Sequence, residues 1–144
     1  MRGIRVVNAR LGLVLSHLGG MLKALLPLFQ LGLGGKLGDG RQWMSWIALE
    51  DVIGAFYHIL LTDSLRGPVN LVSPNPVSQA VFAKTLARIL SRPCFFSIPR
   101  FLLFGEKAKE LLLSSSYAAS DLLLKTGYVF LYSNLLDVLQ KEVS

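Results

Sequence analysis

The sequence predicts an α/β fold in which parallel strands and helices alternate along the chain. Short runs of β-branched residues, bounded by glycine or polar residues, are separated by segments whose apolar residues recur at helical spacing. Such alternation is typical of sheets whose strands are joined by helical crossovers. The chain has 144 residues, of which 52% are hydrophobic, a high fraction for one modest domain. Either the core contains an unusually large share of the residues, or one apolar face of the domain is covered by a partner.

The first half of the chain is expected to contain two strands and two helices. Its first strand is rich in β-branched residues, and Arg10, Leu11 and Gly12 would lie at the carboxyl end of that strand. The second helix carries Glu50 and Asp51 at its start, where negative charge suits the helix dipole. The expected elements are a strand in the first part of residues 4–15, a helix over 21–31, a glycine-rich loop over 32–40, an aromatic strand over 42–47 and a helix over 51–61.

The second half of the chain begins with one more strand and then becomes mainly helical. The Ser-Pro-Asn-Pro sequence at 73–76 predicts a rigid turn that leads into a helix. The expected elements are strands over 69–72 and 95–98 and helices over 78–90, 101–113, 121–125 and 135–141.

Composition and charge argue against several classes of protein. The net charge is +6, but the basic residues are scattered, so no nucleic-acid-binding arm is expected. The most apolar stretch, residues 21–33, is interrupted by polar residues and a proline and is too short for the roughly 20 residues that span a bilayer. The N-terminus lacks the features of a secretory signal, and the single cysteine, Cys94, allows no internal disulfide. We therefore expect a cytoplasmic protein without a transmembrane segment.

Three segments of the chain carry the motifs of one protein family. The first reads Arg-Leu-Gly-Leu-Val-Leu at 10–15, followed by Gly-Gly-Met-Leu at 19–22. The second is the glycine-rich and aromatic run over 29–47, and the third covers 67–77 and an F-A-x-x-L-x-x-x-L-x-R-P helix ending at Pro93. Together they resemble the epimerase family branch of the extended short-chain dehydrogenases/reductases, over essentially the whole chain.

The resemblance implies the C-terminal, substrate-side half of such a protein. Residues 1–76 would be the C-terminal part of a Rossmann-like NAD(P)-binding domain, including a substrate loop. Residues 77–144 would be the small, helical or α+β C-terminal domain of unknown function that ends these proteins.

The residues that carry the family's chemistry are absent from the sequence. A G-x-G-x-x-G turn cannot be read, since Gly32 and Gly34 would need a third glycine at Leu37. The family also uses a Tyr-x-x-x-Lys pair, in which the lysine lowers the pKa of the tyrosine hydroxyl. None of the four tyrosines in this sequence is followed by a lysine at that spacing. A further departure is Ala48, where the family usually has the histidine of a W-I-H-x-D-D run. We therefore predict that the nucleotide-binding half is missing, propose no catalytic residue, and expect the chain alone to be inactive.

The resemblance also implies that the end of the first strand approaches the nicotinamide side of NAD(P). Gly12 would permit close approach of the backbone to the cofactor. The alternative is a strand terminus that simply turns. The cofactor-binding candidates are Arg10, Leu11, Gly12, Leu13 and Val14.

The glycine-rich run over 32–40 and the residues after it resemble a substrate-facing loop and the rim of a pocket. Two aromatic side chains and an Arg-Gln pair beside such a loop suit an apolar pocket with a few polar anchors. The alternative is a flexible connection, with Trp43 or Trp46 simply in the core. The substrate-binding candidates are Arg41, Gln42, Met44 and Trp46.

Asp51 and the two histidines are expected to have structural roles. Asp51 would cap or charge the start of its helix. His58 lies among apolar residues in the middle of a helix, and His17 lies in a loop. Neither histidine has Asp, Glu or Cys at ligand spacing, so no metal site is expected.

Two functions from different classes follow from these observations. The first is the substrate-side half of an NAD(P)-dependent epimerase or oxidoreductase that acts on a small molecule. Its partner would be an N-terminal nucleotide-binding half. This chain alone would bind NAD(P) weakly or not at all. The alternative is a non-catalytic binding or scaffold module, or a gene remnant, that associates with a partner or a membrane surface through the helix expected over 101–113. Self-association through the edge at residues 4–15 is a third expectation.

Overall fold

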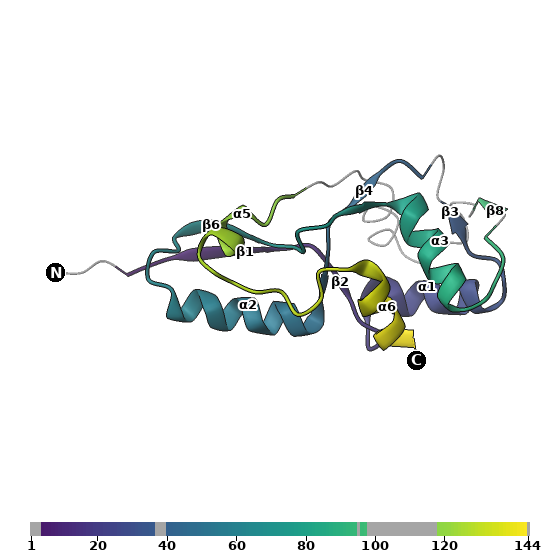
Figure 1. Cartoon of the computed structure of the whole chain (residues 1–144), viewed down its shortest axis with the longest axis horizontal. Coiled ribbons are helices and arrows are strands. Elements are labelled where there is room, and N and C mark those ends of the chain that lie inside the picture. The colour runs from purple at the N-terminus through teal and green to yellow at the C-terminus, as the bar shows by residue number, and fades with distance from the viewer. Residues whose placement is uncertain (1–3, 37–39, 95, 98–117, 144) are drawn as a thin grey trace.

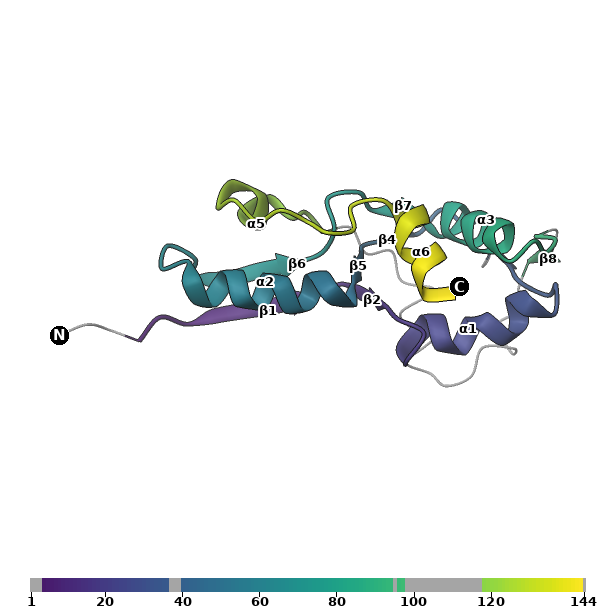
Figure 2. The ribbon, with the colours of Figure 1, turned by 60° about the horizontal axis from the view of Figure 1, so that its bottom comes forward.

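The structure is a computed structural model that describes residues 4–36, 40–94, 96–97 and 118–143. The molecule is elongated, with two groups of elements along its length (Figure 1). One group contains β1 (Val7–Leu11), β6 (Gly67–Leu71), α2 (Leu49–Leu61) and α5 (Asp121–Lys125). The other group contains α1 (Gly20–Gln30), α3 (Gln79–Ile89) and α6 (Leu135–Val143), and Figure 2 shows the same division from a second direction.

Parallel pairing dominates among the strands of the described residues. β1 and β6 are parallel along their whole length. Two further pairs are also parallel: β2 (Leu13–Leu15) with β5 (Trp46–Ala48), and β3 (Gly35–Lys36) with β8 (Phe96–Ser97). One pair is antiparallel: β4 (Trp43–Met44) with β7 (Val77–Ser78). The predicted α/β class is therefore confirmed.

Two of the predicted strands are interrupted where the chain passes from one strand pair to another. The strand expected in the first part of residues 4–15 stops before Gly12 and resumes after it as β2. The aromatic strand expected over 42–47 is divided by Ser45 into β4 and β5. The amide of Leu13 donates to the carbonyl of Ser45 at 2.8 Å, so the two breaks lie side by side. Periodicity could not reveal them, because β-branched and aromatic residues continue on both sides of each break.

α2 leads into β6 and begins at Leu49 instead of Asp51. Its first turn carries two acidic residues, as predicted. Near its other end, Arg5 donates to the carbonyls of Ile59 and Leu65 at 2.9 and 2.8 Å. The Ile59 carbonyl, which also accepts a hydrogen bond from the amide of Thr62, thus gains a second donor, and the segment before β1 is fixed to the end of α2.

Two apolar clusters hold these elements together. The first lies among α1, β2, β5, α3 and α6 and contains the buried rings of Phe29, Trp46 and Phe82. The second lies between α2 and the β1–β6 pair and includes Ile47 and Val69. β5 contributes neighbouring residues to both clusters because successive strand side chains point to opposite faces. Each fully buried side chain of this size contributes about 1.5–3 kcal/mol, so β5 is a strong link between the two groups.

The other described elements agree with the predicted ones to within two residues at each end. One difference is β3, a two-residue strand inside the run that was expected to be a loop. The helix expected over 101–113 lies outside the described residues. Within the described part of the chain, no helix is long and apolar enough to cross a membrane.

Candidate functional site

The candidate site lies at the carboxyl ends of β1 and β6, where the chain leaves this pair to form β2. In open α/β sheets, ligands bind in the crevice outside the carboxyl ends of the strands, where connections diverge. β1 ends at Leu11 opposite Leu71, and the amide of Gly12 donates to the Leu71 carbonyl at 3.1 Å. Leu13 then pairs with Trp46 in β5. The cofactor-binding segment and the substrate-binding segment expected from the sequence are thus adjacent at this point.

Gly12 is required by the packing of the chain itself. A Cβ atom at this position would lie 2.3 Å from the carbonyl oxygen of Ser45 and 2.6 Å from Cγ1 of Val72. Both distances are far shorter than van der Waals contact, so a larger residue fits only if the backbone at Ser45 and the side chain of Val72 both move away from it. The close approach expected at Gly12 is therefore made to neighbouring protein groups, and its contact with a cofactor stays a prediction.

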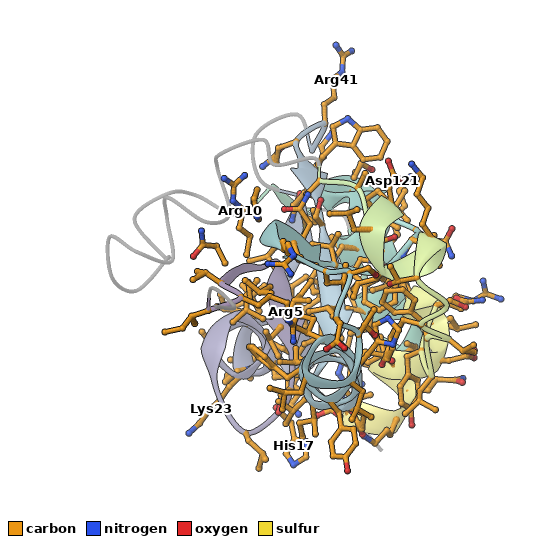
Figure 3. The ribbon with its side chains drawn as sticks, turned by 90° about the vertical axis from the view of Figure 1, so that its left-hand side faces the viewer. Arg5, Arg10, His17, Lys23, Arg41 and Asp121 are labelled. Carbon is orange, nitrogen blue, oxygen red and sulfur yellow. The ribbon has the colours of Figure 1, made fainter. Side chains whose placement is uncertain are left out.

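The five cofactor-binding candidates differ in exposure. Arg10 and Leu11 are exposed at the end of β1, and Figure 3 shows Arg10 at the surface. Gly12, Leu13 and Val14 are only partly exposed. Leu13 packs against the first apolar cluster and Val14 against the second. The side chains best placed to meet a ligand from outside are therefore those of the first two residues.

The four substrate-binding candidates divide in a similar way. Arg41 is exposed and lies at the periphery of the molecule in Figure 3, and Gln42 is partly buried. Met44 and Trp46 are buried in the first apolar cluster. Nε1 of Trp46 donates to the carbonyl of Asn75 at 2.8 Å. Met44 and Trp46 therefore support this region from the core side, and a role in binding substrate stays a prediction.

Buried polar residues that the sequence did not reveal hold the rim of the site together. Gln79, the first residue of α3, is buried. Its backbone amide donates to the Gln42 carbonyl at 2.9 Å, and its side-chain Nε2 donates to the Gly35 carbonyl at 3.3 Å. Oγ of Ser45 accepts a hydrogen bond from the amide of Ala118 at 2.9 Å. Serine and glutamine are usually surface residues, so no pattern in the sequence pointed to these two.

Asp51 anchors the C-terminal segment in addition to charging the start of α2. Its side chain is fully buried, and its carboxylate accepts hydrogen bonds from the Tyr128 hydroxyl at 2.7 Å and from the amides of Leu131 and Tyr132 at 2.8 and 2.9 Å. Burial raises the pKa of the Tyr128 hydroxyl, and the hydrogen bond to Asp51 and its negative charge raise it further. Asp51 therefore charges the first turn of α2, as one of the two expected roles, but it does not cap the helix, whose N-cap residue is Ala48.

Both histidines have structural partners. Nε2 of His58 lies 2.8 Å from Oγ1 of Thr126. The amide and Nδ1 of His17 both lie 2.8 Å from Oε1 of the buried Glu142. Burial by itself would raise the pKa of Glu142, but hydrogen bonds from His17 and the positive charge of Lys141 lower it overall. The described residues contain no group of three or more His, Cys, Asp or Glu side chains that could hold a metal ion.

A cavity of about 580 Å³ lies away from the predicted site. It is lined by α3 and the turn before α6, including Lys84, Arg88 and Asn134, and by none of the predicted site residues. Asn75 also lines it and connects it with Trp46. We place the site at the β1–β6 end because the two predicted binding segments meet there.

Proteins similar in sequence belong to the epimerase family. The chain is 45% identical over 131 residues to the epimerase family protein MT2273 of Mycobacterium tuberculosis, a match that covers 89% of this chain and 44% of that protein. It is 36% identical over 136 residues to the epimerase family protein YfhF of Bacillus subtilis, covering 92% of this chain and 44% of that protein. The chain corresponds to part of an epimerase family protein. No protein-family model matches it.

Solved structures of epimerases share this fold. The human epimerase family protein SDR39U1, whose structure was determined with NADPH, has a TM-score of 0.86 and 33% sequence identity, over 96% of this chain and 48% of that chain. A nucleoside-diphosphate sugar epimerase from Corynebacterium glutamicum has a TM-score of 0.76 and 34% identity, over 96% of this chain and 26% of that chain. The prediction of a partial Rossmann-like epimerase fold is therefore confirmed.

The chain spans about half the length of the epimerase family relatives that it matches, or less. More than half of such a relative therefore has no counterpart in the sequence given. Ala48, which replaces the histidine expected from the family motif, is buried at the end of β5 and precedes the first turn of α2. Its methyl group gives the site no polar side chain at this position.

Proposed function

We propose that this chain supplies the substrate-side wall of an NAD(P)-dependent epimerase or oxidoreductase and has no activity by itself. The observation that carries the proposal is the junction at Gly12. There the chain passes from β1 to β2, and Leu13 pairs with Trp46, so the cofactor-binding and substrate-binding candidates adjoin at the carboxyl end of a parallel strand pair. This is the position at which α/β sheets bind nucleotides. The similar human epimerase family protein that was solved with NADPH supports the cofactor class.

The residues present fit one side of a dinucleotide site. At the exposed end of β1, Arg10 offers a cation on one face of the strand and Leu11 offers an apolar side chain on the other. A bound NAD(P) would supply hydride transfer. No glycine-rich turn is available to hold its pyrophosphate, so that contact has to come from the complementary half.

On the substrate side, we assign direct contact to Arg41 and Gln42 and a supporting role to Met44 and Trp46. Arg41 is exposed, whereas Met44 and Trp46 are buried in the core. Because Trp46 is fully buried, replacing it would disturb the core before it disturbed a substrate. We propose no nucleophile and no proton donor within this chain.

The cofactor assignment is tested in a chimera, defined as MT2273 in which the matching stretch is replaced by this chain. Arg10→Ala should weaken NADPH binding by roughly tenfold, the loss expected for one charge-assisted contact. Arg66→Ala, which removes another exposed arginine, is the matched control and should leave the Kd unchanged. Equal effects of the two changes would mean that Arg10 does not face the cofactor.

The alternative of a scaffold or membrane-associated module stays a prediction, because the helix on which it depends lies outside the described residues. A cytoplasmic location likewise stays a prediction.

A further inference from the structure

An open cavity of about 580 Å³ lies between α3 and the segment that leads into α6. The two helices lie side by side in both Figure 1 and Figure 2, and their buried faces meet in the first apolar cluster. Small organic ligands occupy cavities of about 300–1,000 Å³. The space between α3 and α6 is therefore sufficient for such a ligand, and the function proposed above makes no use of it.

One wall of this cavity is positively charged. Lys84 and Arg88 are exposed and lie four positions apart, so their side chains share one face of α3. Neither cation forms an ion pair with a residue that the structure describes, and none of the described residues that line the cavity is acidic. Two like charges one turn apart repel each other, and a bound anion would relieve that repulsion. The wall therefore favours an anionic ligand.

The segment before α6 adds a neutral hydrogen-bond donor. Oδ1 of Asn134 accepts a hydrogen bond from the amide of Leu136 at 3.0 Å, which leaves Nδ2, without a partner among the described residues, to donate to a ligand. Nδ2 of Asn75 is already engaged, because it donates to the Ser133 carbonyl at 2.6 Å. A guanidinium, an ammonium and an amide group around one cavity suit a phosphate, whose oxygens accept several hydrogen bonds at once.

The rest of the lining is largely aliphatic. It includes the side chains of Val77, Val81, Leu135 and Leu136, of which Val81 is 47% exposed. An aliphatic chain that lay over these side chains would remove apolar surface from water. No aromatic side chain is among the described residues of the lining, so a nucleobase would have no ring on which to stack. The cavity therefore suits an aliphatic ligand better than a nucleotide.

We propose that this cavity binds a phosphate monoester that carries an aliphatic chain. The phosphate would lie at Lys84 and Arg88, within reach of Asn134, and the chain would lie over the aliphatic side chains. A phosphate monoester has close to two negative charges at neutral pH and so matches both cations, whereas a carboxylate matches one. The site would be separate from that of NAD(P), since none of the predicted cofactor-binding or substrate-binding residues lines the cavity.

The test is calorimetric titration of the chimera with hexyl phosphate, hexanol and inorganic phosphate. Hexyl phosphate should bind saturably, and the other two should bind at least roughly tenfold more weakly, because each lacks one part of the contact. Arg88→Gln and Lys84→Gln should each weaken hexyl phosphate binding roughly tenfold by removing a charge-assisted hydrogen bond. Lys23→Gln, which removes an exposed cation on α1, is the matched control and should leave the Kd unchanged.

Two further measurements separate the charge from the fold and the cavity from the cofactor site. Arg88→Lys keeps the positive charge and should retain most of the affinity that Arg88→Gln loses. Saturating NADPH should leave the Kd of hexyl phosphate unchanged. Sedimentation with vesicles of phosphatidylcholine and phosphatidic acid identifies the source of the phosphate. Sedimentation that Arg88→Gln reduces assigns it to a membrane lipid, and absence of sedimentation assigns it to a soluble ester.

Four results would overturn the proposal: no binding of hexyl phosphate, binding no tighter than that of inorganic phosphate, equal losses in Lys23→Gln and Arg88→Gln, or displacement of hexyl phosphate by NADPH. The proposal does not rest on the function proposed above. A chimera that binds hexyl phosphate through Arg88 but binds no NADPH contradicts the proposed function alone.

Discussion

At the scale of single residues, the site region depends on short distances and buried polar contacts. Gly12 allows the β1–β6 and β2–β5 pairs to approach each other, because a Cβ would collide with Ser45 and Val72. Asp51 attaches the C-terminal segment to the start of α2, because its carboxylate accepts hydrogen bonds from the Tyr128 hydroxyl and the Leu131 amide. Buried groups of this kind are costly to leave without partners, so each of these positions tolerates few replacements.

Gly12→Ala should therefore act on stability before it acts on cofactor binding. We expect the chimera to lose about 1–3 kcal/mol, the usual cost of forcing an extra methyl group into a packed site. The measurement is the urea midpoint of the chimera. Gly19→Ala is the control, because a Cβ at Gly19 would meet nothing within 4 Å and the backbone there is extended. This change should lower the free energy of unfolding by less than about 1 kcal/mol. Equal losses at the two glycines would show that the approach at Gly12 is not tight.

Motifs in the sequence drew attention to particular residues, whereas residues that matter only through packing were missed. The family motif drew attention to Gly12 and Trp46, but it could not show that the neighbours of Gly12 are protein groups. Gln79 and Ser45 were missed because a buried polar side chain is defined by partners far away in the sequence.

At the scale of elements, the predicted helices and strands are largely present, and the errors concern breaks and long-range attachments. The strand breaks at Gly12 and Ser45 arise from changes of strand partner, and periodicity along one strand carries no information about its partner. α6 was predicted, but its attachment was not: Glu142, near its end, is held by His17 from the loop after β2.

This attachment should make α6 sensitive to acid. The folded-state pKa of Glu142 is depressed, so the stabilisation is present above the ordinary value of 4.5 and is lost as the pH falls through the folded-state value. We expect the Tm of the chimera to fall more steeply below about pH 4.5 than the Tm of its Glu142→Gln variant, which cannot be protonated at this site. Parallel Tm profiles would mean that the contact with His17 does not stabilise the fold.

At the scale of the whole molecule, the high apolar fraction of the sequence has a structural counterpart. Among the residues that the structure describes, Ile53, Phe56 and Leu60 of α2 are exposed and β1 has a strand partner on one edge only, in line with the expectation that one face needs a partner. An uncovered apolar patch of roughly 400 Å² forgoes on the order of 10 kcal/mol, comparable to the net stability of a domain. The α/β class and the incomplete Rossmann-like fold could be predicted from alternation and motifs. The position of the uncovered surface could not, because it requires knowing which face of α2 is already occupied.

The chain expressed alone should therefore be aggregated, partly molten or self-associated, and co-expression with the complementary half should yield a soluble complex. Size-exclusion chromatography combined with thermal unfolding distinguishes these states. A monodisperse monomer with one sharp unfolding transition would show that the chain needs no partner to fold.

NADPH titration of the isolated chain and of the chimera, followed by the fluorescence of Trp43 and Trp46, tests the central claim most directly. If this chain is the substrate-side half of a cofactor site, the chimera should bind NADPH saturably and the chain alone should not, because the pyrophosphate contacts belong to the other half. Saturable binding by the isolated chain in the low micromolar range, or no binding by a folded chimera, would contradict it.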